Sequence, residues 1–308
     1  MKALYFNGNS LEFKNNYEVP HRASNESLIK IKYAGICNTD REILKGYRPD
    51  FKGVLGHEFV GEVVETDDEG LFGKRVVGEI NKGCGQCKYC LSAMENHCLD
   101  RQVLGINKHD GVFAEYISWP NRLLHIIDDD LEDEKALFTE PLAAALEILQ
   151  LESIKPDTRV LLLGDGRLSY MIGQVIALTG CEINVLGKHE EKLLNFKAFA
   201  NTMLDTKDTY PIVIDATGSP TGIHKALELV ENRGKIVVKS TYTENVEIDL
   251  SEIVVRELKI SGSRCGPFKP ALNLLTKGYV NFPKIKFYDL KDYKEAFSSR
   301  EFKVGFKL

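Results

Sequence analysis

Four cysteines lie within fifteen residues of this 308-residue chain, with the spacing C-x2-C-x2-C-x7-C: Cys84, Cys87, Cys90 and Cys98. Two-residue gaps let successive thiolates turn toward one point, and zinc binds four thiolates tetrahedrally at about 2.3 Å each. Because such a site leaves no open position, the spacing predicts a structural zinc lobe over residues 81–100. Lys82 and Lys88 would offset part of the thiolate charge. The alternatives are a loop of reduced thiols, or His97 in place of Cys98 as the fourth ligand.

A second set of possible metal ligands is spread over three segments. AGICNTD carries Cys37 with Thr39 and Asp40, LGHEFVGEV carries His57 and Glu58, and TEPLAAALE carries Glu140. Cysteine, histidine and carboxylate together suit a zinc ion that keeps one position open for a reactant. Taken singly, a lone cysteine is more often a buried apolar residue, and a glutamate at a helix start is more often stabilised by the helix dipole. The prediction therefore depends on their joint occurrence.

The segment RVLLLGDGRLSYMIGQ has the pattern of a strand, a glycine-rich turn and a helix. Gly164 and Gly166 fit the first two positions of the G-x-G-x-x-G motif, which permit a tight turn and a close approach to a pyrophosphate. The third position, where glycine allows close packing of helix on strand, is Ser169. We predict a dinucleotide site here, with an ordinary strand–helix turn as the alternative.

The next strand of this pattern, INVLG, ends in Gly187, Lys188 and His189. An NAD site usually has an acidic side chain at this place to bind the adenosine ribose hydroxyls. Glycine leaves room there, and the two basic side chains could pair with a 2′-phosphate. The sequence alone thus favours NADP over NAD, which remains possible, and the alternative is a solvated loop with incidental charge.

The elements that must position these groups fall into two classes. Residues 1–139 contain short alternating strands with turns and few helical patterns. From Glu140, apolar strands alternate with helices, including one expected over residues 190–200, as in a doubly wound parallel sheet. The last 43 residues contain a short helix and a strand-like ending. We predict an α/β protein with a mostly β domain, residues 1–139 and 266–308, around a parallel-sheet domain, residues 140–265.

Composition excludes several classes of protein. The chain has 40 Lys and Arg against 45 Asp and Glu, a formal charge of −5, whereas proteins that coat nucleic acid are usually basic. It contains no apolar run of 18 residues, so we expect no membrane partner. Seven cysteines, an odd number, and an N-terminus without an apolar leader argue against a disulfide framework. We therefore expect a cytoplasmic enzyme.

In order along the chain, these motifs resemble those of the zinc-dependent medium-chain alcohol dehydrogenases, and the polyol and threonine dehydrogenase branch in particular. The resemblance is carried by GICNTD, GHEFVGEV, the four-cysteine segment, DGVFAEY, EPLAAAL, LLLGDG and DATGS. It covers nearly the whole chain and implies a GroES-like catalytic domain with a Rossmann domain inserted in it. The turn between VVETDDEG and LFGKRVV is shorter than in many members of the family.

The resemblance also implies roles for individual residues. Cys37 and His57 would be direct ligands of a catalytic zinc, and Glu58 would be a ligand that exchanges with water. Glu140 stands where many members have a cysteine, and it would bind zinc or hold its water. Thr39 would pass the alcohol proton toward solvent. Asp40 would accept a hydrogen bond from His57 and fix its tautomer.

By the same resemblance, the protein would hold one catalytic and one structural zinc ion and would transfer hydride between an alcohol or polyol, or its carbonyl product, and a nicotinamide cofactor. Thr217 in DATGS, and Arg264 after a later strand, would lie near the cofactor, because ligands bind at the carboxyl ends of parallel strands. We expect a homodimer or homotetramer. The competing hypotheses are a related reductase of C=C bonds, carbonyls or quinones, and a non-catalytic zinc protein that senses nucleotides.

Overall fold

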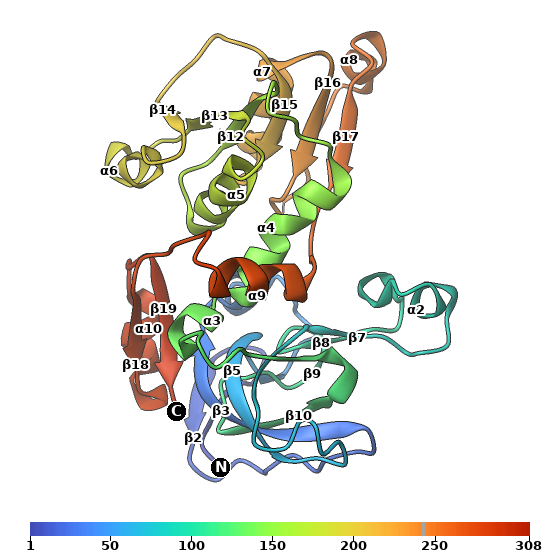
Figure 1. Cartoon of the computed structure of the whole chain (residues 1–308), viewed down its shortest axis with the longest axis vertical. Helices are drawn as coiled ribbons and strands as arrows, with labels where there is room; N and C mark the ends of the chain where they lie inside the picture. Colours follow the sequence, from blue (N-terminus) through green and yellow to red (C-terminus); the bar gives the residue numbers. More distant parts are fainter. Residues whose placement is uncertain (242–243) are drawn as a thin grey trace. The chain divides into compact units, whose positions relative to one another are not determined.

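The computed structural model describes residues 1–241 and 244–308. The chain divides into two compact units, residues 1–140 with 268–308, and residues 141–267 (Figure 1). The boundary falls within helix α4, Thr139–Leu151.

A seven-stranded sheet forms the centre of the first unit. Its order is β11-β6-β5-β3-β19-β18, and β10 pairs with the first half of β3. All these pairs are antiparallel except β18 with β19. The bounds are β3 Glu26–Gly35, β5 Glu58–Glu65, β6 Arg75–Gly78, β10 Tyr116–Pro120, β11 Leu124–Ile126, β18 Ile285–Tyr288 and β19 Lys303–Lys307.

Two small sheets and several short helices complete this unit. The sheets have the orders β2-β1-β4 and β7-β8-β9. Their strands are β1 Ala3–Phe6, β2 Leu11–Lys14, β4 Gly53–Val54, β7 Asn81–Lys82, β8 Gln102–Leu104 and β9 Lys108–His109. The helices are α1 Asn38–Leu44, α2 Lys88–Leu91, α3 Asp133–Ala136, α9 Phe268–Thr276 and α10 Tyr293–Ser298. Short 3-10 turns cover Glu95–His97, Asn121–Leu123 and Leu290–Asp292. Helix α2 lies in a lobe that projects beyond β7 and β8 (Figure 1).

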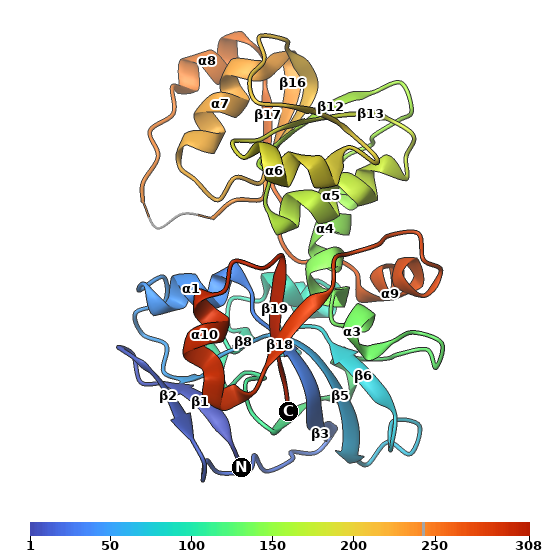
Figure 2. The ribbon, with the colours of Figure 1, turned by 90° about the vertical axis from the view of Figure 1, so that its left-hand side faces the viewer.

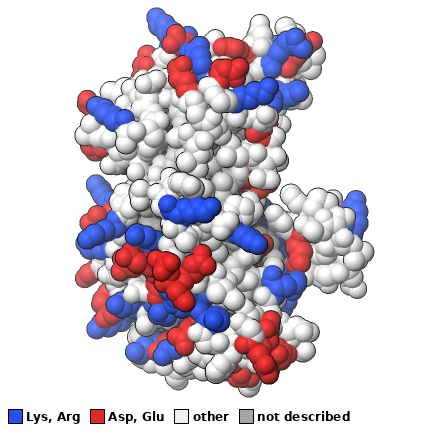
Figure 3. Space-filling model, viewed as in Figure 1, with Lys and Arg blue, Asp and Glu red and all other residues white. Residues whose placement is uncertain are grey.

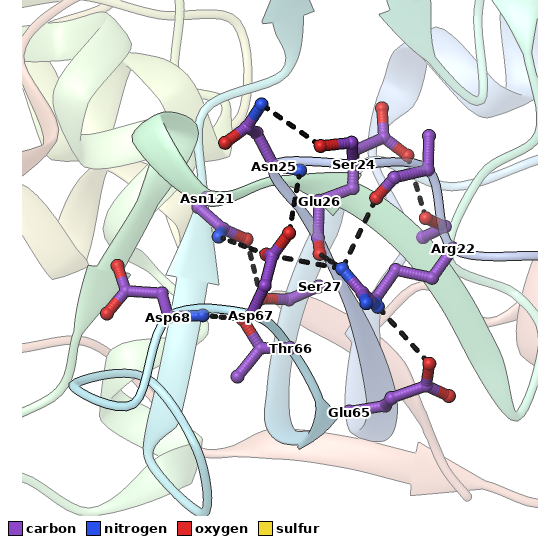
Figure 4. Close-up of polar contacts among 12 residues, drawn as sticks. Arg22, Ser24, Asn25, Glu26, Ser27, Glu65, Thr66, Asp67, Asp68 and Asn121 are labelled. Atoms are coloured by element: carbon purple, nitrogen blue, oxygen red, sulfur yellow. Dashed lines mark hydrogen bonds and ion pairs between the residues drawn. The ribbon is translucent and has the colours of Figure 1, made fainter.

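The position of β3 is fixed at its N-terminal end by a polar network (Figure 4). Ser27 Oγ lies 2.9 Å from Thr66 Oγ1, just after β5, and 2.7 Å from Asn121 Oδ1, just after β10. Arg22 forms an ion pair of 3.2 Å with Asp67 in the same turn. The network ties the two neighbours of β3 to its first residues. Between this end and the opposite end of β3, where the candidate ligands lie, the pairing with β5 shifts register twice, between Leu28 and Ile29 and between Ile31 and Tyr33.

The second unit is a six-stranded parallel sheet with the order β14-β13-β12-β15-β16-β17. The strands are β12 Arg159–Leu163, β13 Glu182–Leu186, β14 Asn201–Met203, β15 Tyr210–Asp215, β16 Val230–Val238 and β17 Lys259–Gly262. In order of appearance this is 3-2-1-4-5-6, which is the Rossmann arrangement, with the strand order reversing between β12 and β15. The fold is therefore a GroES-like β domain with a Rossmann sheet, as predicted.

The helices of the Rossmann unit are α5 Arg167–Ala177, α6 Glu190–Leu193, α7 Thr221–Leu229 and α8 Leu250–Val255 (Figure 2). The long helix expected over residues 190–200 is wrong in extent. It ends at Leu193 and continues as a 3-10 turn, Leu194–Phe196. Phe196 and Phe199 turn inward there to pack against the Tyr170 ring of α5, with both ring centroids 5.4 Å away. Packing of aromatic side chains thus outweighs helix propensity in this segment.

Each unit has a core of buried apolar side chains. In the Rossmann unit, Leu161, Val213 and Ile236 from three neighbouring strands are completely buried against α7. In the first unit, the single tryptophan, Trp119, is fully buried and its indole N–H donates to the Glu79 carbonyl at 2.8 Å. None of the described helices combines the length and apolar character needed to cross a lipid bilayer. Figure 3 shows basic side chains interspersed with acidic ones over the face drawn.

Candidate metal centres and dinucleotide turn

The first candidate metal centre forms at the C-terminal end of β3. Gly35, the last residue of β3, pairs with Glu58 at the start of β5 on one side and with Gly305 of β19 on the other. Cys37 lies two residues after the end of β3 and is the N-cap of α1, while His57 directly precedes β5. Antiparallel pairing therefore brings the AGIC and GHE segments together, although twenty residues separate them.

The backbone before His57 is held by glycines that allow very close packing. Gly56 adopts a positive φ of 93°, and a Cβ atom there would lie 2.5 Å from the Phe113 ring. Val112 N–H donates to the Gly56 carbonyl at 3.0 Å, and Phe113 N–H to the Leu55 carbonyl at 2.9 Å. The DGVF segment thus pairs with the GHE segment and fixes the direction in which His57 leaves the backbone.

The Cys37 sulfur, one His57 ring nitrogen and one Glu58 oxygen all lie within 4.8 Å of one another. His57 and Glu58 are almost completely buried, with exposed fractions of 3% and 1%. Sulfur, imidazole nitrogen and carboxylate oxygen are together a ligand set that suits zinc, and three protein donors leave a fourth position for a reactant. The donor chemistry therefore fits the predicted catalytic metal.

Asp40 lies behind this cluster and is completely buried. Its Oδ2 accepts a hydrogen bond from the Cys37 backbone N–H at 2.8 Å, and its Oδ1 lies 3.4 Å from His57 Nδ1. Burial lowers the pKa of His57, but the charge and hydrogen bond of Asp40, together with the contacts of Cys37, outweigh burial, and the pKa is raised well above its usual value. With Nδ1 facing Asp40, the Nε2 atom is the nitrogen directed to a metal.

Glu58 is paired with a cation that the sequence analysis did not identify. Lys303, the first residue of β19, is buried with an exposed fraction of 3%, and its ammonium forms an ion pair with Glu58 Oε2. The same ammonium donates to the Ile36 carbonyl at 3.3 Å. Gly35 makes room for the carboxylate, because a Cβ atom there would collide with it. No motif marks Lys303, since it lies 245 residues from Glu58 in the sequence.

The other two predicted members of this site are placed differently. The Cys37 thiol lies 3.7 Å from Thr39 Oγ1, so the hydroxyl is adjacent to the cluster. Glu140 is half-buried in the first turn of α4, and the three-residue cluster does not include it. Its role toward zinc stays a prediction.

The second candidate centre brings the four clustered cysteines together. The sulfur atoms of Cys84, Cys87, Cys90 and Cys98 all lie within 4.8 Å of one another. Cys87 Sγ is 3.5 Å from Cys90 Sγ, which is 4.0 Å from Cys84 Sγ. Zinc–sulfur bonds of about 2.3 Å place the corners of a tetrahedron about 3.8 Å apart, so these separations fit one zinc ion. Two backbone N–H groups, of Gln86 and Cys87, lower the pKa of Cys84 to about 7, which favours its thiolate.

Salt bridges outside the cluster hold the four-cysteine lobe on the sheet. Glu95 accepts from the Gly83 backbone N–H at 3.0 Å and pairs with Arg122 at 2.7 Å. Lys82, expected to offset thiolate charge, instead forms a 2.6 Å ion pair with Glu26 of β3. The expectation that Lys82 offsets thiolate charge is therefore wrong, because its ammonium pairs with the buried Glu26 carboxylate instead. His97 is exposed and stands outside the four-sulfur cluster.

The Rossmann unit places the glycine-rich turn where its sequence predicts. Gly164 has a φ of 113°, and Gly166 is the N-cap of α5. A Cβ atom at Gly166 would meet no other atom within 4 Å, so the space in front of this helix terminus is open to a pyrophosphate. Ser169 is completely buried, and its hydroxyl donates to the Ala216 carbonyl at 3.4 Å. Serine replaces the usual glycine here because that carbonyl satisfies its hydroxyl.

The other predicted cofactor residues follow neighbouring strands of this sheet. Thr217, after β15, donates both its backbone N–H and its hydroxyl to Asp215 Oδ1, at 2.9 and 2.7 Å. Arg264 is exposed after β17, and its carbonyl accepts from Lys239 at 2.9 Å. Lys188 and His189 follow Gly187 at the end of β13, and both are exposed. These positions all lie after the carboxyl ends of parallel strands, but their contacts with a cofactor stay predictions.

Comparison with known proteins relates the whole chain to dehydrogenases. The alcohol dehydrogenase GroES-like domain family matches residues 23–129. The chain is 30% identical to a D-arabitol-phosphate dehydrogenase of Enterococcus avium, over 91% of this chain and 88% of that protein. It is 29% identical to a sorbitol dehydrogenase of Halalkalibacterium halodurans, over 85% of this chain and 84% of that protein.

Solved structures resemble the full length of the chain. A zinc-binding dehydrogenase of Sinorhizobium meliloti bound to NADP is 26% identical, with a TM-score of 0.89, and the match covers 100% of this chain and 99% of that one. An alcohol dehydrogenase of Escherichia coli in complex with NADH is also 26% identical, with a TM-score of 0.90 and the same coverage. Both forms of the nicotinamide cofactor thus occur among the structural neighbours.

We predict that Cys87→Ser removes one of two zinc ions from each chain and locally unfolds the lobe, because a three-thiolate remnant binds zinc more weakly. Metal analysis should give about two ions for the native protein and one for the variant, and hydrogen exchange should rise between residues 81 and 100. Cys181→Ser, which removes a thiol from the Rossmann unit, is the control and should keep both ions. A variant that retains two ions would contradict the assignment.

We further predict that Lys303→Met destabilises the first unit and reduces turnover. The substitution leaves the buried Glu58 carboxylate without its cation, and breaking a buried ion pair costs about 3–5 kcal/mol. The urea midpoint followed by circular dichroism should fall, and Lys303→Arg should restore most of the loss. Lys307→Met, on the exposed end of the same strand, is the matched control. An unchanged midpoint in Lys303→Met would rule out an essential pair.

Proposed function

Because this chain belongs to the zinc-dependent medium-chain alcohol dehydrogenase family, we propose that Cys37, His57 and Glu58 hold the catalytic zinc of an enzyme that oxidises a polyol or reduces the corresponding carbonyl. The protein is an NAD(P)-dependent oxidoreductase that acts on alcohols of the polyol class. The three-residue cluster carries the proposal, since it combines donors that bind zinc with a position open to a hydroxyl group.

Zinc supplies a Lewis acid for the alcohol or carbonyl oxygen, and the nicotinamide supplies or accepts the hydride. The chain's own residues orient the reactants and move the proton. Asp40 holds the His57 tautomer, and Lys303 holds Glu58 in the cluster. The Thr39 hydroxyl, adjacent to the Cys37 thiol, accepts the proton of the substrate hydroxyl and passes it toward solvent. Glu140 contributes a further carboxylate, as a ligand or through water.

We divide the work between the two parts of the chain. Residues 1–139 and 266–308 form the catalytic domain with the structural zinc lobe, held by Cys84, Cys87, Cys90 and Cys98, and residues 140–265 bind the dinucleotide. Gly164, Gly166 and Ser169 shape the pyrophosphate site, while Gly187, Lys188 and His189 border the adenosine ribose. Thr217 and Arg264 lie toward the nicotinamide half. None of the described cysteines forms a disulfide bond, and thiolate ligands need reducing conditions, so we propose a cytoplasmic location.

We also propose that the protein forms a homodimer, or a tetramer of such dimers, through the edge of the Rossmann sheet. β17 is an edge strand that pairs only with β16 among the described strands. Beside it, Leu250, Val254 and Val255 of α8 are 71%, 74% and 81% exposed. An edge strand can pair antiparallel with its own copy about a two-fold axis, which would also cover an adjacent apolar patch.

The homodimer predicts a specific effect of Val254→Asp. A charge introduced into the patch should shift the protein from dimer toward monomer, because it would be desolvated at the interface. Sedimentation equilibrium at several protein concentrations measures the change. Leu178→Asp is the control, because Leu178 is an exposed apolar residue at the end of α5 and does not belong to the α8 patch. This variant should leave the molecular mass in solution unchanged. A native protein that is monomeric at every concentration would overturn the proposal.

The activity is tested with zinc-replete protein and a panel of polyols, polyol phosphates, simple alcohols and the matching carbonyl compounds, with NAD(H) and NADP(H). We expect change in nicotinamide absorbance with at least one polyol. His57→Ala should abolish turnover, because it removes a buried metal ligand, while dinucleotide binding persists in the separate Rossmann unit.

Two outcomes would contradict this function. Normal turnover by zinc-replete His57→Ala protein would exclude His57 as a ligand of a catalytic metal. Tight dinucleotide binding without turnover on the whole panel would instead favour the nucleotide-sensing hypothesis. Metal analysis of the same samples separates loss of zinc from loss of folding.

A further inference from the structure

At the end of β13, a glycine stands where an acidic residue is usual, and an acidic residue from another segment lies beside it. This arrangement bears on the choice of cofactor. Position 187, where an acidic side chain would hold the adenosine ribose, is a buried glycine. The space beside it is filled by Asp165 of the glycine-rich turn. A Cβ atom at position 187 would lie 2.8 Å from Asp165 Cβ and 2.9 Å from its Oδ2. Asp165 of the turn thus places its carboxylate where an acidic side chain at position 187 would otherwise lie.

Asp165 is firmly held at this place. Its Oδ2 accepts hydrogen bonds from the backbone N–H groups of Lys188 at 2.7 Å and His189 at 2.9 Å. The same oxygen lies 2.9 Å from His189 Nδ1, and Lys192 Nζ lies 3.9 Å from Oδ1. The side chain is only 10% exposed. Burial raises the pKa of Asp165, but the donors of His189 and Lys188 outweigh burial and lower it, so the group is an anion at neutral pH.

These contacts use the same groups that would bind a 2′-phosphate. Two backbone donors, an imidazole and an ammonium surround one anion, and that anion is already part of the chain. A second, dianionic group would meet the Asp165 carboxylate and would have to displace it. A carboxylate repels a phosphate, but it favours ribose hydroxyls, because they donate hydrogen bonds to it. All three described hydrogen bonds end on Oδ2, so Oδ1 can accept from a hydroxyl.

We propose that Asp165 is the residue that determines cofactor specificity, and that it makes this site select NAD(H) over NADP(H). The inference rests on the dinucleotide site of the proposed function and reverses the preference expected from Gly187, Lys188 and His189 alone. Glycine at position 187 makes room for the acid, and the two basic residues are its partners. The selectivity therefore comes from a residue 22 positions before the one where it is usually sought.

The native protein provides the first test, by calorimetric titration at low salt with adenosine 5′-monophosphate and adenosine 2′,5′-bisphosphate. These probes differ only in the 2′-phosphate and need no substrate or metal. We expect the monophosphate to bind at least about tenfold more tightly, and NAD to exceed NADP by a similar factor. Equal or tighter binding of the bisphosphate would overturn the proposal. Binding of neither probe and neither dinucleotide would overturn the dinucleotide site itself.

Variants then assign the effect to Asp165. In Asp165→Asn the preference should shift toward the bisphosphate by about tenfold or more, because the anion is lost and its donors are released. The double variant Asp165→Gly with Gly187→Asp should restore the preference for the monophosphate, since it returns the carboxylate from the other backbone position. Asp157→Asn, which removes an exposed charge from the same unit, is the matched control and should change neither affinity.

A purely structural role for Asp165 gives a different result. If the role were only structural, Asp165→Asn would lower the affinities for both probes by the same factor. The ratio of the two affinities would then keep its native value, and this result would overturn the proposal. Gly187→Asp alone is a further check. Its side chain would collide with Asp165 and with the Leu193 Cδ2 atom, so it should weaken both ligands more than the double variant, in which only the end of the Leu193 side chain must shift.

Discussion

A carboxylate enclosed by protein is stable only where opposite charge or hydrogen bonds replace the water it has lost, and Glu58 of the first unit meets this requirement with an ammonium. Glu58 is 1% exposed and belongs to a cluster that already contains a thiol. Lys303 supplies the ammonium from the C-terminal strand β19. That strand lies beside β3, which explains why the last residues of the chain return to a sheet begun by the first sixty. The topology of the domain and the electrostatics of its metal cluster therefore depend on one another.

The pair also affects the chemistry open to Glu58. If Glu58 holds a metal as proposed, a carboxylate that shares its charge with Lys303 would be a weaker ligand than an isolated one and would exchange more readily with water. The Ile36 carbonyl, 3.3 Å from the ammonium, gives Lys303 a second acceptor besides the carboxylate. Asp40 acts on the opposite side, where it holds His57 through Nδ1. Two of the three proposed ligands, His57 and Glu58, thus lie against charged residues that are not themselves members of the cluster.

The sequence predicts what is local and repeated, and it misses what depends on distant pairing. The strand–turn–helix pattern at Gly164 and the four clustered cysteines are both brought together as expected. The twist and pairing of β3 with β19 have no local signal, so Lys303 could not be found. The helix over residues 190–200 was extended too far, because its composition favours helix and does not reveal that Phe196 and Phe199 pack against Tyr170. Lys82 was misassigned for the same reason, since its partner Glu26 lies 56 residues away.

Two of the carboxylates to which we assign functional roles occupy space that a glycine leaves open. Glu58 lies over Gly35, and Asp165 lies over Gly187, and in each case a Cβ atom would collide with the carboxylate. A glycine of this kind marks the place where another segment delivers its side chain. It does not mark a place where a charge is missing. If Asp165 sets the selectivity as proposed, residue type at one position is not enough to predict the cofactor, because the relevant charge can be supplied by any backbone segment that reaches the site. On this proposal, the glycine at position 187 says less about the cofactor than the Asp165 carboxylate that fills the space beside it.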